Sequence, residues 1–242
     1  MRQLLPRDLV VDDLPALLGA DDRPAPPGRP WVLANMVTSV DGAFAVDGRS
    51  GGLGGEPDRL MFTAVRSLPD VILVGAGTAR TERYRRPAPG PAADLRTARG
   101  QSAAPRLAVV SNRGHVPEDQ PFLAGDGPDP LLFHPATAAL TGLPAGVEPV
   151  EAGTESVDLA GALAYLVATG ARTVLCEGGP TLLGELHTAD LVDEYFVTLA
   201  PNMVGGGQVG FLGGTSAQAR DLRLHRLLEQ DDVLLGTWRR DR

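Results

Sequence analysis

The sequence predicts an α/β protein with a mostly parallel central sheet, helices on both faces and an antiparallel hairpin at the C-terminal edge. Short apolar runs rich in β-branched residues alternate with segments of helical periodicity between Trp31 and Leu199. This order is typical of parallel strands joined by helices. Two later apolar runs, residues 222–228 and 233–238, flank the polar segment EQDD and predict the hairpin.

The expected strands are apolar runs that stop at a glycine, a proline or a polar turn. In chain order they cover residues 31–37 (WVLANMV), 70–74 (DVILV), 106–110, 131–133, 173–176 (TVLC) and 193–199 (DEYFVTL).

The expected helices have apolar residues at helical spacing. Residues 57–68 begin at a proline and are apolar at 60, 61, 64, 65 and 68, residues 157–169 end before Gly170, and a third helix starts over residues 181–187. Residues 85–105 are rich in arginine, proline and alanine, and we expect a long surface loop there.

The length, charge and composition of the chain limit the kinds of function that we expect. The chain has 242 residues, of which 43% are hydrophobic, so we expect one domain over residues 30–242 and an N-terminal extension over 1–29 that packs on it or leads into it. A net charge of −8 argues against a nucleic-acid partner. One cysteine excludes an internal disulfide framework, and no apolar stretch is long enough to span a bilayer. We therefore expect a soluble cytoplasmic protein.

Two familiar motifs fit poorly, and metal-ligand spacing is absent. Residues 48–52 match G-x-S-x-G, but Ser50 lies in a glycine-rich loop and no helix follows directly, so a serine hydrolase is a distant alternative. Residues 205–210 match G-x-G-x-x-G without a clear helix after them. The four histidines are scattered with no ligand spacing, so we expect no metal site.

The ends of the predicted strands carry the polar and glycine residues that remain. They are Asp41-Gly42, Gly75-Ala76-Gly77-Thr78, Ser111-Asn112-Arg113 and Glu177-Gly178-Gly179. Ligands of open α/β sheets bind at the carboxyl edge of the strands, and glycine turns before a helix can hold a pyrophosphate through backbone N–H groups. Ser111 and Arg113 would suit the extra phosphate of NADP. The pattern therefore predicts a phosphorylated cofactor.

Several short segments occur in one order along the chain: TSVDG (38–42), AVRS (64–67), DVILVGAGT (70–78), EGGPTLL (177–183), VDE (192–194), AP (200–201) and GG (205–206). In this order they resemble the reductase domain of the bifunctional riboflavin-biosynthesis deaminase–reductase, a family with the dihydrofolate reductase-like fold. The resemblance implies a homodimer that uses NADPH to reduce 5-amino-6-(5-phosphoribosylamino)uracil. Hydride would go to C1′ of the opened, imine form of this phosphorylated pyrimidine substrate.

The strand ends and the resemblance together give the candidate site residues. The cofactor-binding candidates are Val37, Gly75, Gly77, Thr78, Glu82, Ser111, Arg113, Gly178, Gly179, Pro180, Thr181 and Leu182. The substrate-binding candidates are Asn35, Ser50, Arg66, Arg83, Arg85, Arg86 and Glu177, with the three arginines at 83, 85 and 86 where the family anchors the substrate phosphate.

Asp41 and Glu177 are the catalytic candidates. Asp41 would handle a proton or order a water near the ribose, or it could be only the turn residue that its Asp-Gly pair indicates. Glu177 would accept hydrogen bonds from N–H groups of the pyrimidine, or it could be only an acid stabilised at a helix N-terminus.

Two departures from the family leave other functions open. Asn35 replaces a lysine common in the first strand, and residues 81–84 read TERY where the family usually has Ala-Asp-Asp-Pro. The alternatives are a paralogue that reduces a pteridine such as dihydrofolate, and a non-catalytic NADP-binding protein of the same fold.

Overall fold

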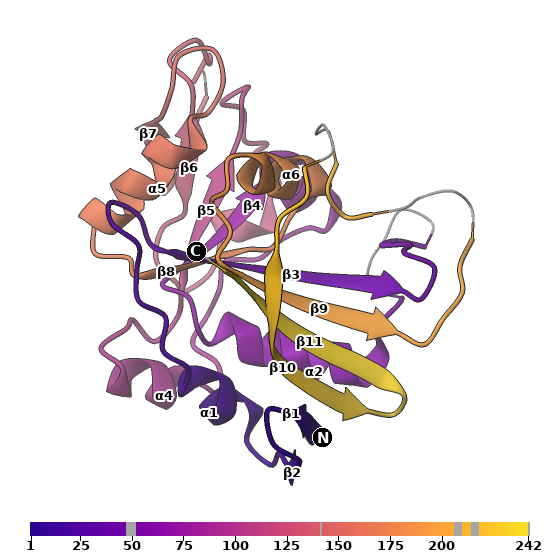
Figure 1. Cartoon of the computed structure of the whole chain (residues 1–242). Helices are drawn as coiled ribbons and strands as arrows, with labels where there is room; N and C mark the ends of the chain where they lie inside the picture. Colours follow the sequence, from indigo (N-terminus) through magenta and orange to yellow (C-terminus); the bar gives the residue numbers. More distant parts are fainter. Residues whose placement is uncertain (47–51, 141, 206–209, 214–217, 242) are drawn as a thin grey trace.

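The computed structural model describes residues 1–46, 52–140, 142–205, 210–213 and 218–241. Within these residues eleven strands form one sheet in the order β2-β1-β10-β11-β9-β3-β8-β4-β5-β6-β7 (Figure 1). Strands β9, β3, β8, β4, β5, β6 and β7 run parallel to their neighbours in that order, whereas β11, β10, β1 and β2 pair antiparallel. The predicted fold class, a mostly parallel sheet with an antiparallel C-terminal hairpin, is confirmed.

The strands are β1 (Arg2–Leu5), β2 (Leu9–Val10), β3 (Trp31–Ser39), β4 (Val71–Gly75), β5 (Arg106–Val110), β6 (Leu131–His134), β7 (Glu148–Glu151), β8 (Thr173–Cys176), β9 (Glu194–Ala200), β10 (Leu222–Gln230) and β11 (Val233–Arg240). The helices are α1 (Leu14–Gly19), α2 (Gly55–Arg66), α3 (Ala76–Thr81), α4 (Ala93–Ala98), α5 (Leu159–Ala168) and α6 (Pro180–Thr188), and a 3-10 turn covers Pro121–Leu123. The predicted bounds of β5 and β8 agree with these.

Two expectations about local structure were wrong. The hairpin does not form the edge of the sheet, because β1 pairs with β10 and β2 pairs with β1. The stretch 85–105 is not a plain surface loop, because it contains α4. Arg96 of α4 is 2% exposed and donates to the backbone carbonyls of Ser67 and Pro69 at 3.1 and 2.7 Å, which fixes this helix against the end of α2.

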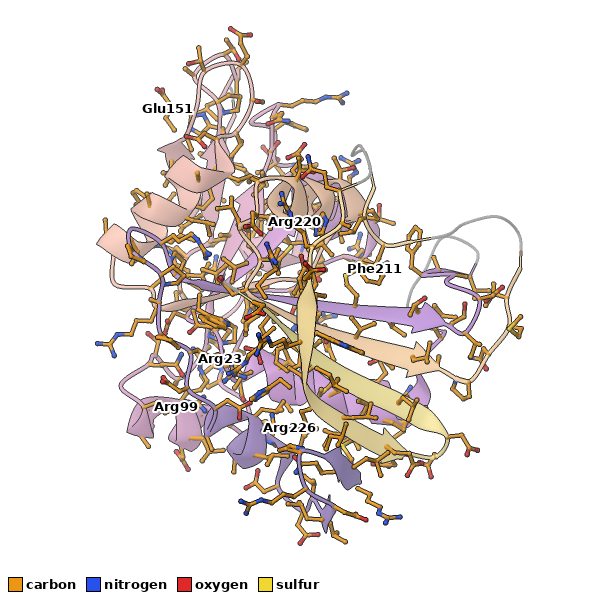
Figure 2. All side chains as sticks on the ribbon, in the orientation of Figure 1. Arg23, Arg99, Glu151, Phe211, Arg220 and Arg226 are labelled. Carbon is orange, nitrogen blue, oxygen red and sulfur yellow. The ribbon has the colours of Figure 1, made fainter. Side chains whose placement is uncertain are left out.

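Buried ion pairs attach the N-terminal segment to the far strands. Arg29 makes a two-pronged contact with Asp193 at 2.6 and 2.8 Å, and Arg23 donates to Glu194 at 2.8 Å. Figure 2 shows Arg23 near the point where this segment meets the C-terminal strands. Because the partner carboxylates lie just before β9 and at its first residue, residues 21–29 are held against the strand that neighbours β3.

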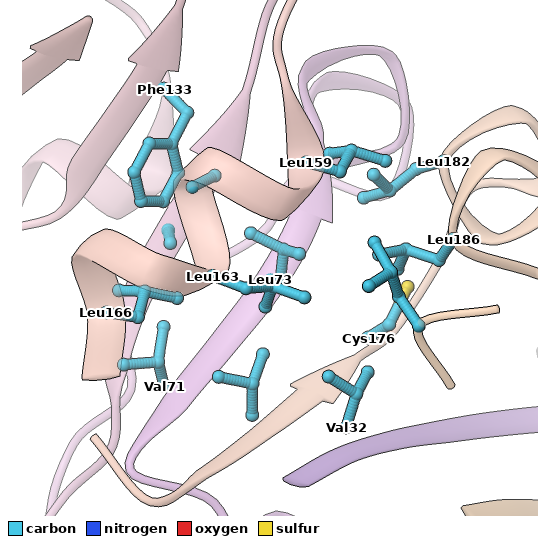
Figure 3. Close-up of a cluster of buried hydrophobic side chains, with 14 of the residues drawn as sticks. Val32, Val71, Leu73, Phe133, Leu159, Leu163, Leu166, Cys176, Leu182 and Leu186 are labelled. Carbon is cyan, nitrogen blue, oxygen red and sulfur yellow. The ribbon is translucent and has the colours of Figure 1, made fainter. Parts of the chain in front are cut away.

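The two faces of the sheet carry separate apolar cores. On one face α5 and α6 cover Val32, Leu73 and Cys176, and Leu163 and Leu186 are among the helix residues that pack there (Figure 3). On the other face α1 and α2 cover alternate residues of the same strands, such as Leu33, Leu175 and Phe196. Side chains that follow Leu33 and Leu175 on this second face therefore point toward α2 at the carboxyl ends of β3 and β8.

Candidate functional site

A cavity of about 840 Å³ lies at the carboxyl ends of β3, β4 and β8, between α2, α3, the segment 82–88 and the start of α6. Its size is within the range of small-molecule sites, and its place is where open parallel sheets bind ligands. Sixteen candidate residues from the sequence line it: Asn35, Val37, Arg66, Gly75, Gly77, Thr78, Glu82, Arg83, Arg85, Arg86, Glu177, Gly178, Gly179, Pro180, Thr181 and Leu182.

The remaining candidates lie elsewhere. Ser111 is buried at the end of β5, and Arg113 is exposed two residues later, one strand beyond β4 along the same edge of the sheet. Neither lines the cavity, and Asp41 does not line it either. Ser50, together with most of the glycine-rich runs around 48–51 and 206–209, falls outside the described residues.

The turn between β8 and α6 brings backbone close to β4. The amide of Gly75 donates to the carbonyl of Gly178 at 3.0 Å, and Gly178 has a φ of +94°, which favours glycine. A Cβ atom added to Gly179 would lie 2.4 Å from Oγ1 of Thr78, so only glycine fits beside this threonine. The peptide bond between Gly178 and Gly179 is cis.

Helix α6 begins directly at this turn with its N-terminus facing the cavity. Gly179 is the N-cap residue and supplies no capping side chain, and Pro180 occupies the first helical position. The first N–H groups of such a helix attract negative charge. The glycine turn and the uncapped helix together form a cradle that fits the phosphate groups of a dinucleotide.

Glu177 lies on the face of the sheet that points toward α2. The Glu177 side chain is 2% exposed. Its carboxylate accepts two hydrogen bonds from Arg66, at 2.7 and 2.6 Å, and a third from the hydroxyl of Tyr84 at 2.9 Å. The guanidinium of Arg66 also stacks over the ring of Phe62 at 4.2 Å. Every oxygen of Glu177 therefore has a donor before any substrate arrives.

Burial and charge together shift the pKa of Tyr84 and of Arg66, the two residues that donate to Glu177. Burial and the negative charge of Glu177 raise the pKa of Tyr84 far above its usual value. Burial lowers the pKa of Arg66, but the hydrogen bond and charge of Glu177 outweigh this, and the net pKa of Arg66 is raised. Tyr84 is thus a fixed neutral donor and Arg66 a permanent cation in the cavity wall.

The three predicted phosphate-binding arginines have different surroundings. Arg86 donates to Asp129 at 2.8 Å and to the backbone carbonyls of Leu123, Phe122 and Gly127, so its guanidinium is used to hold residues 122–129. Arg83 and Arg85 are exposed at the cavity, and among the described residues neither guanidinium has a hydrogen-bond or ion-pair partner. The geometry favours Arg83 and Arg85 over Arg86 as ligands of a phosphate group.

Asp41 holds a loop together outside the cavity. Its carboxylate accepts from the hydroxyl of Ser39 at 2.5 Å and from the backbone amides of Gly205 at 2.7 Å and Val204 at 3.1 Å. These hydrogen bonds, that of Ser39 first, lower the pKa of Asp41 to about 2. The turn that follows β3 is thereby tied to the segment that follows β9, which fits the turn role better than a role in proton handling.

Sequence reasoning missed several residues of the cavity wall, and three of them, Asp58, Phe62 and Tyr84, have side chains that bear on the chemistry. Asp58 and Phe62 precede Arg66 by eight and four residues, so all three lie on one side of α2. Burial raises the pKa of Asp58, and the neighbouring hydroxyl of Thr198 offsets this in part. Because α2 was predicted as a helix, the spacing of four and eight residues from Arg66 could have identified Phe62 and Asp58.

Among the described residues, no group of three or more His, Cys, Asp or Glu side chains could hold a metal ion. None of the helices in that same part of the chain has both the length and the apolar character needed to cross a membrane.

Comparisons with known proteins agree with this geometry. A 2,5-diamino-6-ribosylamino-4(3H)-pyrimidinone 5′-phosphate reductase from Archaeoglobus fulgidus is 30% identical over 185 residues, which are 74% of this chain and 83% of the relative. The riboflavin biosynthesis protein RibD of Mycobacterium tuberculosis is 32% identical over 183 residues, and the matched part is 44% of that longer protein.

Solved structures show the same fold. A pyrimidine reductase-like protein from Corynebacterium diphtheriae has a TM-score of 0.78 and 25% identity, covering 88% of this chain and 92% of its own. RibD from Acinetobacter baumannii has a TM-score of 0.72 and 21% identity, covering 89% of this chain and 59% of its own. The family model described as the RibD C-terminal domain matches residues 30–234. The chain therefore belongs to the RibD C-terminal domain family.

Proposed function

We propose that the protein is an NADPH-dependent reductase of a phosphoribosylamino-pyrimidine in riboflavin biosynthesis, with 5-amino-6-(5-phosphoribosylamino)uracil as the preferred substrate. The observation that carries the proposal is the single cavity that joins the glycine turn at Gly178-Gly179 to the Arg66–Glu177 pair. Membership of a family whose relatives are named as pyrimidinone phosphate reductases and RibD proteins supports the reaction class.

The residues present fit a nicotinamide dinucleotide. Thr78, Gly179 and the N-terminus of α6 would hold the pyrophosphate, Val37 would contact the nicotinamide end, and Ser111 with Arg113 would receive the adenosine phosphate. When bound, the dinucleotide supplies the hydride that the reduction needs. Arg113, an exposed cation beyond β5, is the reason for proposing NADPH over NADH.

The substrate would enter on the α2 side of the cavity. Its phosphate would be held at the mouth by Arg83 and Arg85, which have no other described partner. Glu177 would accept hydrogen bonds from the N–H groups of the pyrimidine, with Arg66 and Tyr84 fixing its carboxylate in place. The chain's own share of the chemistry is then orientation and exclusion of water around the reacting carbon. We also propose that the protein works as a homodimer in the cytoplasm.

The test is oxidation of NADPH by the purified protein, followed by absorbance, with three substrates in parallel. These are 5-amino-6-(5-phosphoribosylamino)uracil, its 2,5-diamino pyrimidinone counterpart and dihydrofolate, each repeated with NADH. We expect turnover of a phosphoribosylamino-pyrimidine with NADPH and none of dihydrofolate. Reduction of dihydrofolate alone would show a pteridine reductase on the same scaffold. NADPH binding without any turnover would indicate a non-catalytic binding protein.

A further inference from the structure

We infer that Asp58 is a catalytic residue, the acid that gives a proton to the ribose ring oxygen of the substrate as the ring opens. This inference rests on the proposed function. The reduction needs a proton as well as a hydride, and the cavity must contain a group that can deliver it. Asp58 lines the cavity from the first turns of α2.

The other titratable groups of the described cavity wall are poor proton donors. Arginines do not release protons near neutral pH. Both oxygens of Glu177 are taken by Arg66, and one of them also by the hydroxyl of Tyr84, whose pKa lies far above the usual range. Glu82 is exposed to solvent at the rim. Asp58 is left as the one half-buried carboxyl group in this part of the wall without a cation bound to its oxygens.

The surroundings of Asp58 favour the protonated form. Burial raises its pKa, and among the described residues the charged neighbour that acts on it is Arg59 from its own helix. The two adjacent strands present uncharged groups, Asn35 from β3 and Thr198 from β9. A carboxyl group in such a place holds its proton to higher pH than one in water, as a general acid must.

An unmet hydrogen-bonding atom in the wall to which Asp58 belongs indicates that a ligand completes this part of the cavity. Oδ1 of Asn35 is buried and has no hydrogen-bond partner in the described structure, and Asn35 lines the same cavity as Asp58. Thr198 is 1% exposed and does not line the cavity, so its hydroxyl acts on Asp58 and not on a ligand. Buried polar atoms without partners are rare in native proteins, so a hydroxylated substrate that donates to Oδ1 of Asn35 is a physical reason for this unpaired atom.

The carboxyl group of Asp58 gives its proton to O4′, and the C1′–O4′ bond breaks with its electron pair going to that oxygen. C1′ becomes the carbon of an iminium cation, C1′=N, and a bound dihydronicotinamide would supply the hydride that converts it to the ribitylamino product. Asp58 is left as a carboxylate and takes up a proton from water at the open side of the cavity.

The experiment compares the pH dependence of kcat for the wild-type protein with that of Asp58→Asn, Thr198→Val and Glu56→Gln. Asp58→Asn keeps the shape but has no acidic proton, so kcat should fall by about 10²–10⁴-fold. The wild-type kcat should fall as the pH rises through the pKa of Asp58, because the protonated form is active. Thr198→Val removes a hydroxyl that lowers this pKa and should move the fall to higher pH.

Glu56→Gln is the matched control, since Glu56 is an exposed acid in the same helical turn that does not line the cavity. NADPH affinity, measured by fluorescence titration, should be unchanged in all three variants, which separates loss of the acid from misfolding. A kcat for Asp58→Asn within threefold of the wild type would overturn the inference. An unmoved pH profile in Thr198→Val would also overturn it, while the proposed function would stand. Absence of turnover by the wild-type protein would instead refute the proposed function and the inference with it.

Discussion

Replacement of Gly179 by alanine tests the cradle at the start of α6. The added Cβ would lie 2.4 Å from Oγ1 of Thr78, about 1 Å closer than an ordinary contact. Neither atom can move freely, because Thr78 belongs to α3 and Gly179 precedes α6. Overpacking of this kind costs about 1–3 kcal/mol. We expect Gly179→Ala to lower Tm by about 2–4 °C for each kcal/mol lost.

The same substitution should weaken NADPH binding at least tenfold, because a shift of Thr78 or of the turn moves the backbone groups that would hold the pyrophosphate. Thermal unfolding and fluorescence titration of NADPH measure the two effects separately. Gly90→Ala is the control, since a Cβ at Gly90 meets no atom within 4 Å and this glycine does not line the cavity.

A double variant shows whether the clash is the cause. In Gly179→Ala combined with Thr78→Ala, the nearest atom to the new Cβ is the Cβ of residue 78, at 3.7 Å, which is an ordinary contact. The double variant should therefore recover most of the Tm lost by Gly179→Ala. Additive losses in the double-mutant cycle, or a Gly179→Ala protein with wild-type Tm and NADPH affinity, would refute the steric argument.

Three further predictions concern charged groups. Glu177→Gln should lower the free energy of unfolding by about 1–3 kcal/mol. The loss is smaller than for a fully buried ion pair because the Arg66 side chain is 35% exposed, and an unchanged urea midpoint would contradict it. Arg113→Ala should raise the Kd for NADPH about tenfold and leave the Kd for NADH unchanged. Equal changes in the two Kd values would show that Arg113 does not bind the extra phosphate of NADPH. Asp41 contributes stability that is present above its unfolded pKa near 3.8 and lost as the pH falls toward its folded pKa of about 2. Asp41→Asn should therefore flatten the acid limb of the unfolding curve, and an unaltered limb would argue against the loop anchor.

The parallel part of the fold was predictable because its strands are buried on both faces. Runs such as DVILV and TVLC have no polar interruption, so sequence alone located β4 and β8 to within a residue. The N-terminal strands were missed because β1 is only four residues long and is defined by its pairing with β10, more than 200 residues away. Helix α4 was missed because its key residue, Arg96, looks like one more surface arginine in an arginine-rich stretch.

Part of the candidate site was likewise predictable from local sequence, and part was not. Glycines at strand ends carry a local signal, and the cavity contains Gly75, Gly178 and Gly179 as expected. Asp58 and Tyr84 reach the cavity only because α2 packs under β3 and because residues 82–88 fold back across the carboxyl edge. The placement of Tyr84 leaves no mark in a local pattern, and Asp58 is marked only by its helical spacing from Arg66.

The most direct measurement follows the hydride itself. The protein is incubated with 5-amino-6-(5-phosphoribosylamino)uracil and NADPH deuterated at the reactive carbon of its nicotinamide, and the product is analysed by NMR spectroscopy and mass spectrometry. We expect one deuterium per product molecule, located at C1′ of a ribityl chain. Unchanged substrate, or a product without deuterium at C1′, would contradict the central claim that this cavity reduces a phosphoribosylamino-pyrimidine by hydride transfer.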